Sequence, residues 1–161
     1  MNKPASAVIG GGVAAAVLSV ILLVVDVETR SQIGIFEVVA RFVGMPGSLV
    51  FGFVLFFAAG TFLWPLVFVA LESYLPIGPD PAIRGMGFGV PLWVAFVVLG
   101  RGDLTGAILV VYAVLTLFAH LVYGFVLGAV YGHYSGETAA RMEPFPGEKR
   151  AGESGGSGGS R

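Results

Sequence analysis

Two long stretches of the chain, residues 42–71 and 104–136, contain no Asp, Glu, Lys or Arg. Two shorter stretches also lack these residues: 4–25, which precedes the first long stretch, and 85–100, which lies between the two. About 20 apolar residues are enough for a helix to cross the hydrocarbon core of a bilayer. The pattern therefore predicts an all-α membrane protein with four transmembrane helices. The predicted spans cover about residues 5–26, 48–72, 81–99 and 104–134.

A fifth helix is predicted between the first two spans, at about residues 30–43. Its apolar residues cover most of the helix surface, while Glu37 and Arg41, four residues apart, share one narrow polar face. Thr29 and Gln32 match a capping box that would begin this helix. The segment is too short to span a bilayer and too apolar for water, so we predict an amphipathic helix at the membrane interface.

Capping residues and prolines mark the remaining helix ends and bends. Asp80 followed by Pro81 is typical of the first turn of a helix. Pro65 and Pro91 lie inside the second and third spans and predict kinks there, because proline removes a backbone hydrogen bond. Candidate N-caps of the last three spans are Ser48, Asp80 and Asp103.

The chain divides at Gly136. Residues 1–136 form the predicted transmembrane domain, and residues 137–161 are polar and rich in Gly, Ser, Glu and Pro, which predicts a disordered tail. With four spans, both termini lie on one side. Lys and Arg favour the cytoplasmic side. Six are on the side of the termini (Lys3, Arg84, Arg141, Lys149, Arg150, Arg161) and three on the other (Arg30, Arg41, Arg101), which predicts cytoplasmic termini.

A weak internal repeat relates the two halves of the chain. Moving the second span by 60 residues onto the fourth aligns identical residues, and moving the first by 75 onto the third aligns glycines. Either the chain consists of two tandem helical hairpins in a two-fold pseudosymmetric bundle, or the matches arose by chance between apolar segments. The first set of aligned residues includes Leu49 with Leu109, Val54 with Val114, and Ala59 with Ala119.

Composition excludes several classes of function. A formal net charge of −1 gives no basic surface for nucleic acid. The absence of cysteine excludes disulfides, thiolate metal sites and cysteine nucleophiles. The chain carries no catalytic motif, so we expect no enzyme activity and no metal site. The acidic residues Asp26, Glu28 and Glu72 lie near span ends and are interpreted as interfacial.

Polar and small residues recur at intervals of four in three spans, and such residues form one ridge on a helix. In the last span this ridge begins with a polar stripe and continues with glycines. Glycines let another backbone approach closely, so they are predicted helix-packing positions, within the chain or between copies. The last ridge comprises Tyr112, Thr116, His120, Gly124, Gly128 and Gly132, and shorter ridges comprise Gly12 and Ala16, and Gly85 and Gly89.

His120 lies near the middle of its span, where an ionisable side chain is expensive and often functional. Three roles are open for it. It is a neutral structural histidine bonded to Thr116, a carbonyl or a tyrosine; or a proton or ion relay; or an axial ligand of haem or a metal. The other histidine, His133, is on a different face of the same helix, so the two cannot bind one iron within a chain.

Several sequence segments resemble a family of small four-span membrane proteins of halophilic archaea. The resemblance covers about residues 1–136 and is carried by segments 31–44, 64–66, 79–85, 100–103 and 119–121. That family has no established function, and some members carry a label that links them to cytochrome c oxidase subunit I. The resemblance implies a plasma membrane and association with a haem–copper respiratory oxidase. Four spans and two histidines are too few for the catalytic subunit itself.

Three functional hypotheses follow. The leading hypothesis is a non-catalytic accessory or structural component of a membrane complex, with the lipid bilayer and other membrane subunits or copies of itself as partners. The first alternative is a small carrier or channel that acts as an oligomer, with His120 lining the path. The second alternative is a membrane protein that binds haem through His120.

Overall fold

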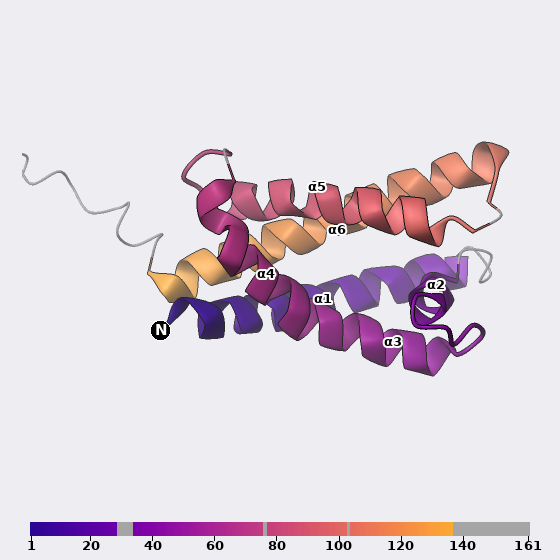
Figure 1. The fold of residues 1–161 in the computed structure, drawn as a ribbon, viewed down its shortest axis with the longest axis horizontal. Helices are drawn as coiled ribbons and strands as arrows, with labels where there is room; N and C mark the ends of the chain where they lie inside the picture. The colour runs from indigo at the N-terminus through magenta and orange to yellow at the C-terminus, as the bar shows by residue number, and fades with distance from the viewer. Residues whose placement is uncertain (29–33, 76, 103, 137–161) are drawn as a thin grey trace, which may run out of the picture.

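The computed structural model describes residues 1–28, 34–75, 77–102 and 104–136. Every regular element in these ranges is helical. Short π-helical and 3₁₀ turns, η1 (Ala59–Leu63) and η2 (Glu72–Tyr74), connect and extend the second span. The α-helices are α1 (Lys3–Glu28), α2 (Ile35–Arg41), α3 (Leu49–Ala58), α4 (Trp64–Leu71), α5 (Pro81–Gly100) and α6 (Gly106–Ser135) (Figure 1).

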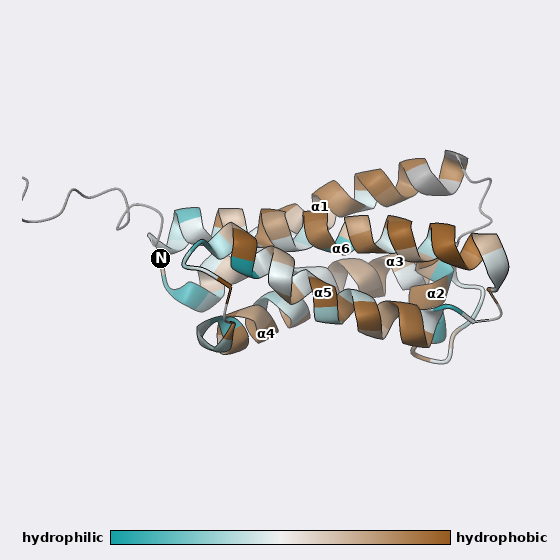
Figure 2. Ribbon diagram, turned by 90° about the horizontal axis from the view of Figure 1, so that it is seen from above, coloured by the Kyte–Doolittle hydropathy of each residue, from teal (hydrophilic) through white to brown (hydrophobic). Residues whose placement is uncertain are grey.

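Four stretches of helix are long and apolar enough to cross a membrane, which confirms the predicted class of fold. They are Lys3–Val24, Leu49–Tyr74, Pro81–Gly100 and Gly106–Ser135. Figure 2 shows hydrophobic residues along most of their length and hydrophilic residues mainly near the two ends of the molecule.

The predicted caps have different outcomes. Asp80 caps α5 as predicted: its carboxylate accepts a hydrogen bond of 2.8 Å from the backbone N–H of Ala82, and Pro81 is the first helical residue. Ser48 stands at the N-cap of α3, but its side chain makes no capping hydrogen bond, so that prediction was wrong. Outside the described residues lie the predicted capping box at Thr29 and Gln32, the cap at Asp103 and the tail at 137–161.

The long helices pack around a central pair, α1 and α6, which lie side by side (Figure 1). The α3–η1–α4 span packs on the other side of α1, and α5 packs on the other side of α6. Both ends of the described chain meet at one end of the bundle, where the amino group of Met1 donates a hydrogen bond of 3.3 Å to the carbonyl of Tyr134.

Both predicted hairpins form, because α1 packs against η1 and α4, and α5 packs against α6. Their arrangement is not the predicted two-fold bundle. A two-fold axis would match the long contact between α1 and α6 with an equal contact between α4 and α5. No comparably long contact joins α4 and α5, although the rings of Phe68 and Phe88 meet with centroids 5.6 Å apart.

The fifth helix, α2, packs against α3 through its apolar face. The ring of Phe36 meets Phe53 edge to face at 5.3 Å, and its carbonyl lies so close to Gly52 that no other residue fits there. Glu37 and Arg41 are exposed on the predicted polar face. Protein contacts therefore hold α2 in place, and its position at the membrane interface stays a prediction. The buried residues of α2 are Ile35, Phe36, Val38, Val39 and Ala40.

Glu72 lies at the end of the second span and is buried within the protein, with 7% of its side chain exposed, and its position at the membrane interface stays a prediction. Lys3 from the first turn of α1 reaches it, with 2.6 Å between Nζ and Oε1. The second carboxylate oxygen of Glu72 is buried and has no hydrogen-bond partner among the described residues. The carboxylate therefore depends on Lys3 for compensation of its charge.

Replacing Lys3 with methionine is expected to lower the free energy of unfolding by about 1–2 kcal/mol, because the buried carboxylate of Glu72 loses its charged partner. The effect is moderate because Lys3 itself is half exposed and its charge is screened by solvent. Detergent unfolding followed by circular dichroism measures this change. Lys3→Arg keeps the charge and should retain most of the stability. The double variant Lys3→Met with Glu72→Gln should recover part of the loss, and a single variant as stable as the wild type would contradict the assigned pair.

Candidate functional site

Helices α5 and α6 cross at very close range through their glycines. A Cβ atom placed on Gly85 would overlap the carbonyl oxygen of Gly124, and one placed on Gly124 would overlap the carbonyl oxygen of Gly85. Neighbouring contacts repeat at intervals of four on both helices, so the two predicted ridges fit together within one chain. The facing residues are Pro81 and Gly128, Gly85 and Gly124, and Gly89 and His120.

Helix α1 makes its close approaches through different residues from those predicted. A Cβ on Gly10 would lie 2.8 Å from the carbonyl oxygen of Leu127 in α6. A Cβ on Gly11 would overlap the ring of Pro65 and lie 2.6 Å from the carbonyl oxygen of Gly60. These two glycines bring α1 against α6 on one side and against the second span on the other.

The structure places the predicted pair on α1 away from these approaches. Gly12 has only ordinary van der Waals contact with the methyl group of Thr61, at 3.6 Å, and Ala16 is exposed. Small residues at 10–12 and 14–16 place a small side chain on nearly every face of the helix, so spacing alone does not select the contact face. Gly132, the last member of the α6 ridge, is buried.

The second span is irregular next to Pro65. A π-helical turn, η1, precedes this proline, which has no N–H to donate to the preceding turn. Tyr123 from α6 donates its hydroxyl hydrogen to the carbonyl of Gly60 at 2.5 Å. The two halves of the chain are thus tied together at the irregular turn. The sequence pattern did not single out Tyr123, although it lies seven residues after Thr116 and so on the same side of the helix.

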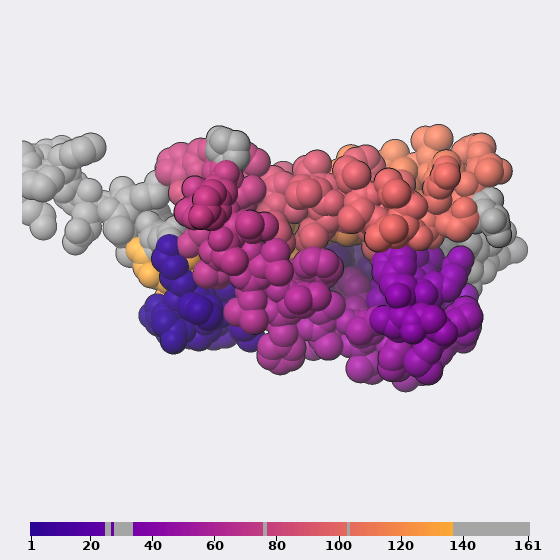
Figure 3. All heavy atoms as spheres, viewed as in Figure 1, coloured from indigo at the N-terminus to yellow at the C-terminus, as the bar shows by residue number. Residues whose placement is uncertain are grey.

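A cavity of about 400 Å³ lies between the second span and α5. Near the termini, Phe68 of α4 meets Phe88 of α5. Toward the other end, Phe42, which directly follows α2, meets Phe96 of α5 with ring centroids 5.6 Å apart. Figure 3 shows a hollow between α5 and the α2–α3 region, with α1 deeper behind it. The lining is almost entirely apolar, and its side chains with polar atoms are Trp64, Thr116, His120 and Tyr123.

His120 presents one ring nitrogen to a backbone carbonyl. Its Nδ1 lies 2.7 Å from the carbonyl oxygen of Thr116. Because a carbonyl oxygen only accepts, this contact assigns the proton of the neutral ring to Nδ1 and makes Nε2 the acceptor. Nε2 has no hydrogen-bond partner among the described residues. The ring packs against Phe96 with centroids 5.4 Å apart, so it is held from two sides.

The other two side chains of the predicted polar stripe are buried, and one of them is hydrogen-bonded to the backbone. Thr116 donates its hydroxyl hydrogen to the carbonyl of Tyr112 at 2.7 Å, one turn earlier in the helix. Tyr112 is fully buried and stacks on Phe96 at 6.1 Å. Its hydroxyl has no partner in the described part of the chain. Thr116 and His120 therefore line the cavity, and Tyr112 lies buried beside it.

His133 is separate from this site. It is exposed in the last turn of α6 and meets Tyr134 edge to face at 5.2 Å. In residues 1–28, 34–75, 77–102 and 104–136, no three His, Asp or Glu side chains lie close enough together to hold a metal ion. Of the two histidines, only His120 lines the cavity.

Comparison with known proteins gives a family and no activity. No curated protein and no solved structure shows a significant match to the chain. One family profile, described as a family of unknown function, matches residues 1–142, which include all four spans and the cavity. The chain therefore belongs to the family of unknown function DUF6789.

Proposed function

We propose that this protein is a non-catalytic membrane protein that binds a small, largely apolar molecule from the bilayer in the cavity beside His120. The observation that carries the proposal is an apolar cavity of about 400 Å³ whose lining includes an imidazole with one unpartnered nitrogen. Sites for small molecules are mostly apolar hollows of about 300–1,000 Å³ with a few polar groups that fix orientation.

The hydrogen bonds of the cavity restrict the chemistry of the ligand. Thr116 and Tyr123 both donate their hydroxyl hydrogens to backbone carbonyls. His120 donates from Nδ1 in the same way, which leaves Nε2 as an acceptor. Apart from the indole N–H of Trp64, the described lining offers no free donor to a ligand with only a carbonyl oxygen, whereas a ligand with a hydroxyl group finds an acceptor in Nε2. The arrangement favours an apolar molecule with a hydroxyl group, such as a long-chain alcohol, an isoprenoid alcohol or a quinol.

A matched pair of probes tests this proposal through Trp64, whose side chain lines the cavity. Bromine quenches tryptophan fluorescence, so 12-bromododecan-1-ol and 1-bromododecane report binding with and without a hydroxyl group. In a Trp93→Phe background, we expect saturable quenching by the alcohol. His120→Ala should weaken that binding by about 5- to 10-fold, the value of one hydrogen bond, and should leave the bromoalkane unaffected.

The control variant is His133→Ala, which removes the exposed histidine far from the cavity. It should bind the bromoalcohol as the parent does. Equal quenching by the two probes in the parent, or bromoalcohol binding that His120→Ala leaves unchanged, would overturn the proposed hydroxyl site.

A second proposal rests on the same nitrogen. An unprotonated Nε2, with Nδ1 bonded to a carbonyl, is also the arrangement of a histidine that ligates haem or a metal. His120 would supply a single axial ligand, because His133 is exposed at another position of α6. An absorption spectrum of the purified protein tests this role: a Soret band lost in His120→Ala supports haem, and a colourless protein rejects it.

We propose the cellular setting from the sequence. Six of the nine Lys and Arg residues lie on the side of the termini, which supports cytoplasmic termini in a plasma membrane. The resemblance to small membrane proteins of halophilic archaea supports an accessory role in a respiratory complex. The glycines of α5 and α6 pack against each other within the chain, so self-association would need a different surface. A carrier or channel function stays a prediction.

A further inference from the structure

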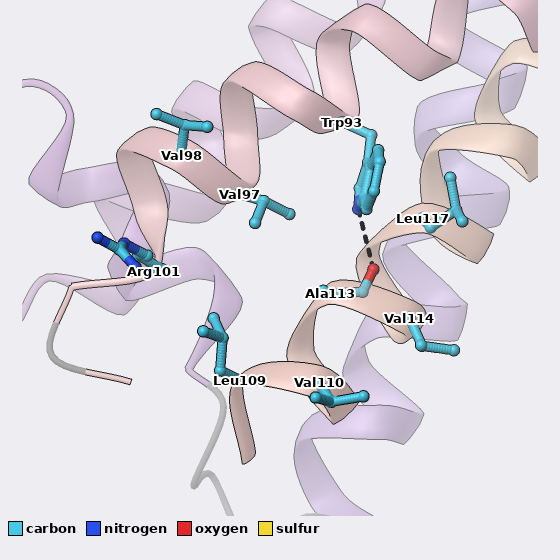
Figure 4. A pocket seen from close by; sticks show the side chains of 9 residues that line it. All are labelled: Trp93, Val97, Val98, Arg101, Leu109, Val110, Ala113, Val114 and Leu117. Carbon is cyan, nitrogen blue, oxygen red and sulfur yellow. Dashed lines mark hydrogen bonds between the residues drawn. The ribbon is translucent and has the colours of Figure 1, made fainter. Parts of the chain in front are cut away.

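A second hollow lies on the outer side of α5 and α6, away from the cavity beside His120. It is an open groove of about 610 Å³ (Figure 4). Trp93 stands at one end and Arg101 at the other, with aliphatic side chains from both helices between them (Figure 4). These aliphatic residues include Val97, Val98, Leu109, Val110, Val114 and Leu117.

The sequence of α5 explains why the helices separate here. Glycine allows the close crossing at Gly85 and Gly89, but α5 has no further glycine until Gly100. Larger side chains then keep the backbones apart. Trp93 bridges the inner end of the gap by donating its indole N–H to the carbonyl of Ala113 at 2.9 Å (Figure 4). The groove therefore follows from the residues of α5 and α6 that face each other beyond the glycine crossing.

The length of the groove matches one leaflet of a bilayer. Trp93 and Arg101 are eight residues apart, which is about 12 Å along a helix. Half of a hydrocarbon core is about 15 Å thick. Arg101 directly follows the last residue of α5 and is exposed. The groove thus extends from the end of the span, where headgroups lie, to near the middle of the membrane.

One cation, Arg101, lines the outer end of this groove, and a second lies near the turn that follows α5. Besides Arg101, the guanidinium of Arg41 in α2 approaches the same turn, where its Nη1 would lie 2.9 Å from a Cβ placed on Gly102. Neither arginine forms an ion pair with a carboxylate of the described residues. Guanidinium groups bind phosphate strongly and with defined geometry.

We propose that this groove binds one hydrocarbon chain of an anionic phospholipid, with the lipid phosphate at Arg101 and Arg41. Aliphatic side chains contact the hydrocarbon chain, and Trp93 limits its depth. The inference does not depend on the ligand of the His120 cavity, because the two hollows share no lining residue.

Native mass spectrometry of the full-length protein in detergent tests the site with added phosphatidylglycerol. Val110 lines the groove and Val111 does not, although both are exposed valines of α6. We expect Val110→Trp to remove the retained lipid and Val111→Trp to keep it. Arg101→Gln should weaken retention about 5-fold, which is the contribution of one arginine near an anionic lipid surface.

Two further measurements distinguish a specific lipid site from a simple anion site and from non-specific lipid. Inorganic phosphate should compete poorly with phosphatidylglycerol, because it lacks the hydrocarbon chain; efficient competition would indicate a simple anion site and overturn the proposal. Phosphatidylcholine, which is zwitterionic, should be retained less than phosphatidylglycerol by the wild type. Equal lipid retention by Val110→Trp and Val111→Trp would show non-specific lipid around the helices and would also overturn it.

Discussion

Replacing Gly124 with leucine is expected to lower the free energy of unfolding by about 3 kcal/mol or more. Gly124 and Gly85 approach so closely that even a methyl group on either would overlap the backbone of the other helix. A flexible side chain could move aside, but a carbonyl oxygen in the middle of a helix cannot. Helices α5 and α6 would have to separate, and the packing of α1 along α6 would be disturbed as well.

The matched control for this prediction is Ala129→Leu. Ala129 is exposed on α6, only five residues from Gly124, so the same side chain would extend into lipid or detergent there. Unfolding in a series of SDS mole fractions, followed by circular dichroism, gives the stability of both variants. If the two substitutions lower stability equally, the close crossing of α5 and α6 through glycine is wrong.

Replacing Tyr123 with phenylalanine is expected to destabilise the protein by about 2 kcal/mol, although only one oxygen atom is lost. The hydroxyl of Tyr123 supplies the hydrogen bond to the carbonyl of Gly60, in the irregular turn before Pro65. Without that donor, the carbonyl is left unpaired in an apolar environment, where water does not replace the lost bond.

Tyr134→Phe is the control for the hydroxyl group itself. Tyr134 is exposed near the end of α6, so loss of its hydroxyl should change the stability by less than about 0.5 kcal/mol. The same unfolding measurement serves both variants. If the Tyr123→Phe protein is as stable as the Tyr134→Phe protein, the hydrogen bond from Tyr123 to the carbonyl of Gly60 does not contribute to stability.

Part of the site was predictable from local pattern. The intervals of four in α6 identified Thr116 and His120, which line the cavity, and the glycines that pack against α5. The interval does not reveal the partner of a residue. Tyr123 was missed because its role depends on Gly60, 63 residues earlier in the chain. The pairing of Lys3 with Glu72 spans 69 residues and was missed for the same reason.

The sequence by itself determined the four spans and the cap of α5, because both depend on short stretches of chain. A run of uncharged residues sets the length of a spanning helix, and Asp80 caps the turn that directly follows it. Only the tertiary structure decided that Gly10 and Gly11 face their neighbours while Ala16 is exposed, and that α3 and α5 stand apart around a cavity. The physical reason is that lipid is as apolar as the protein interior, so hydrophobicity does not mark which face of a membrane helix is buried.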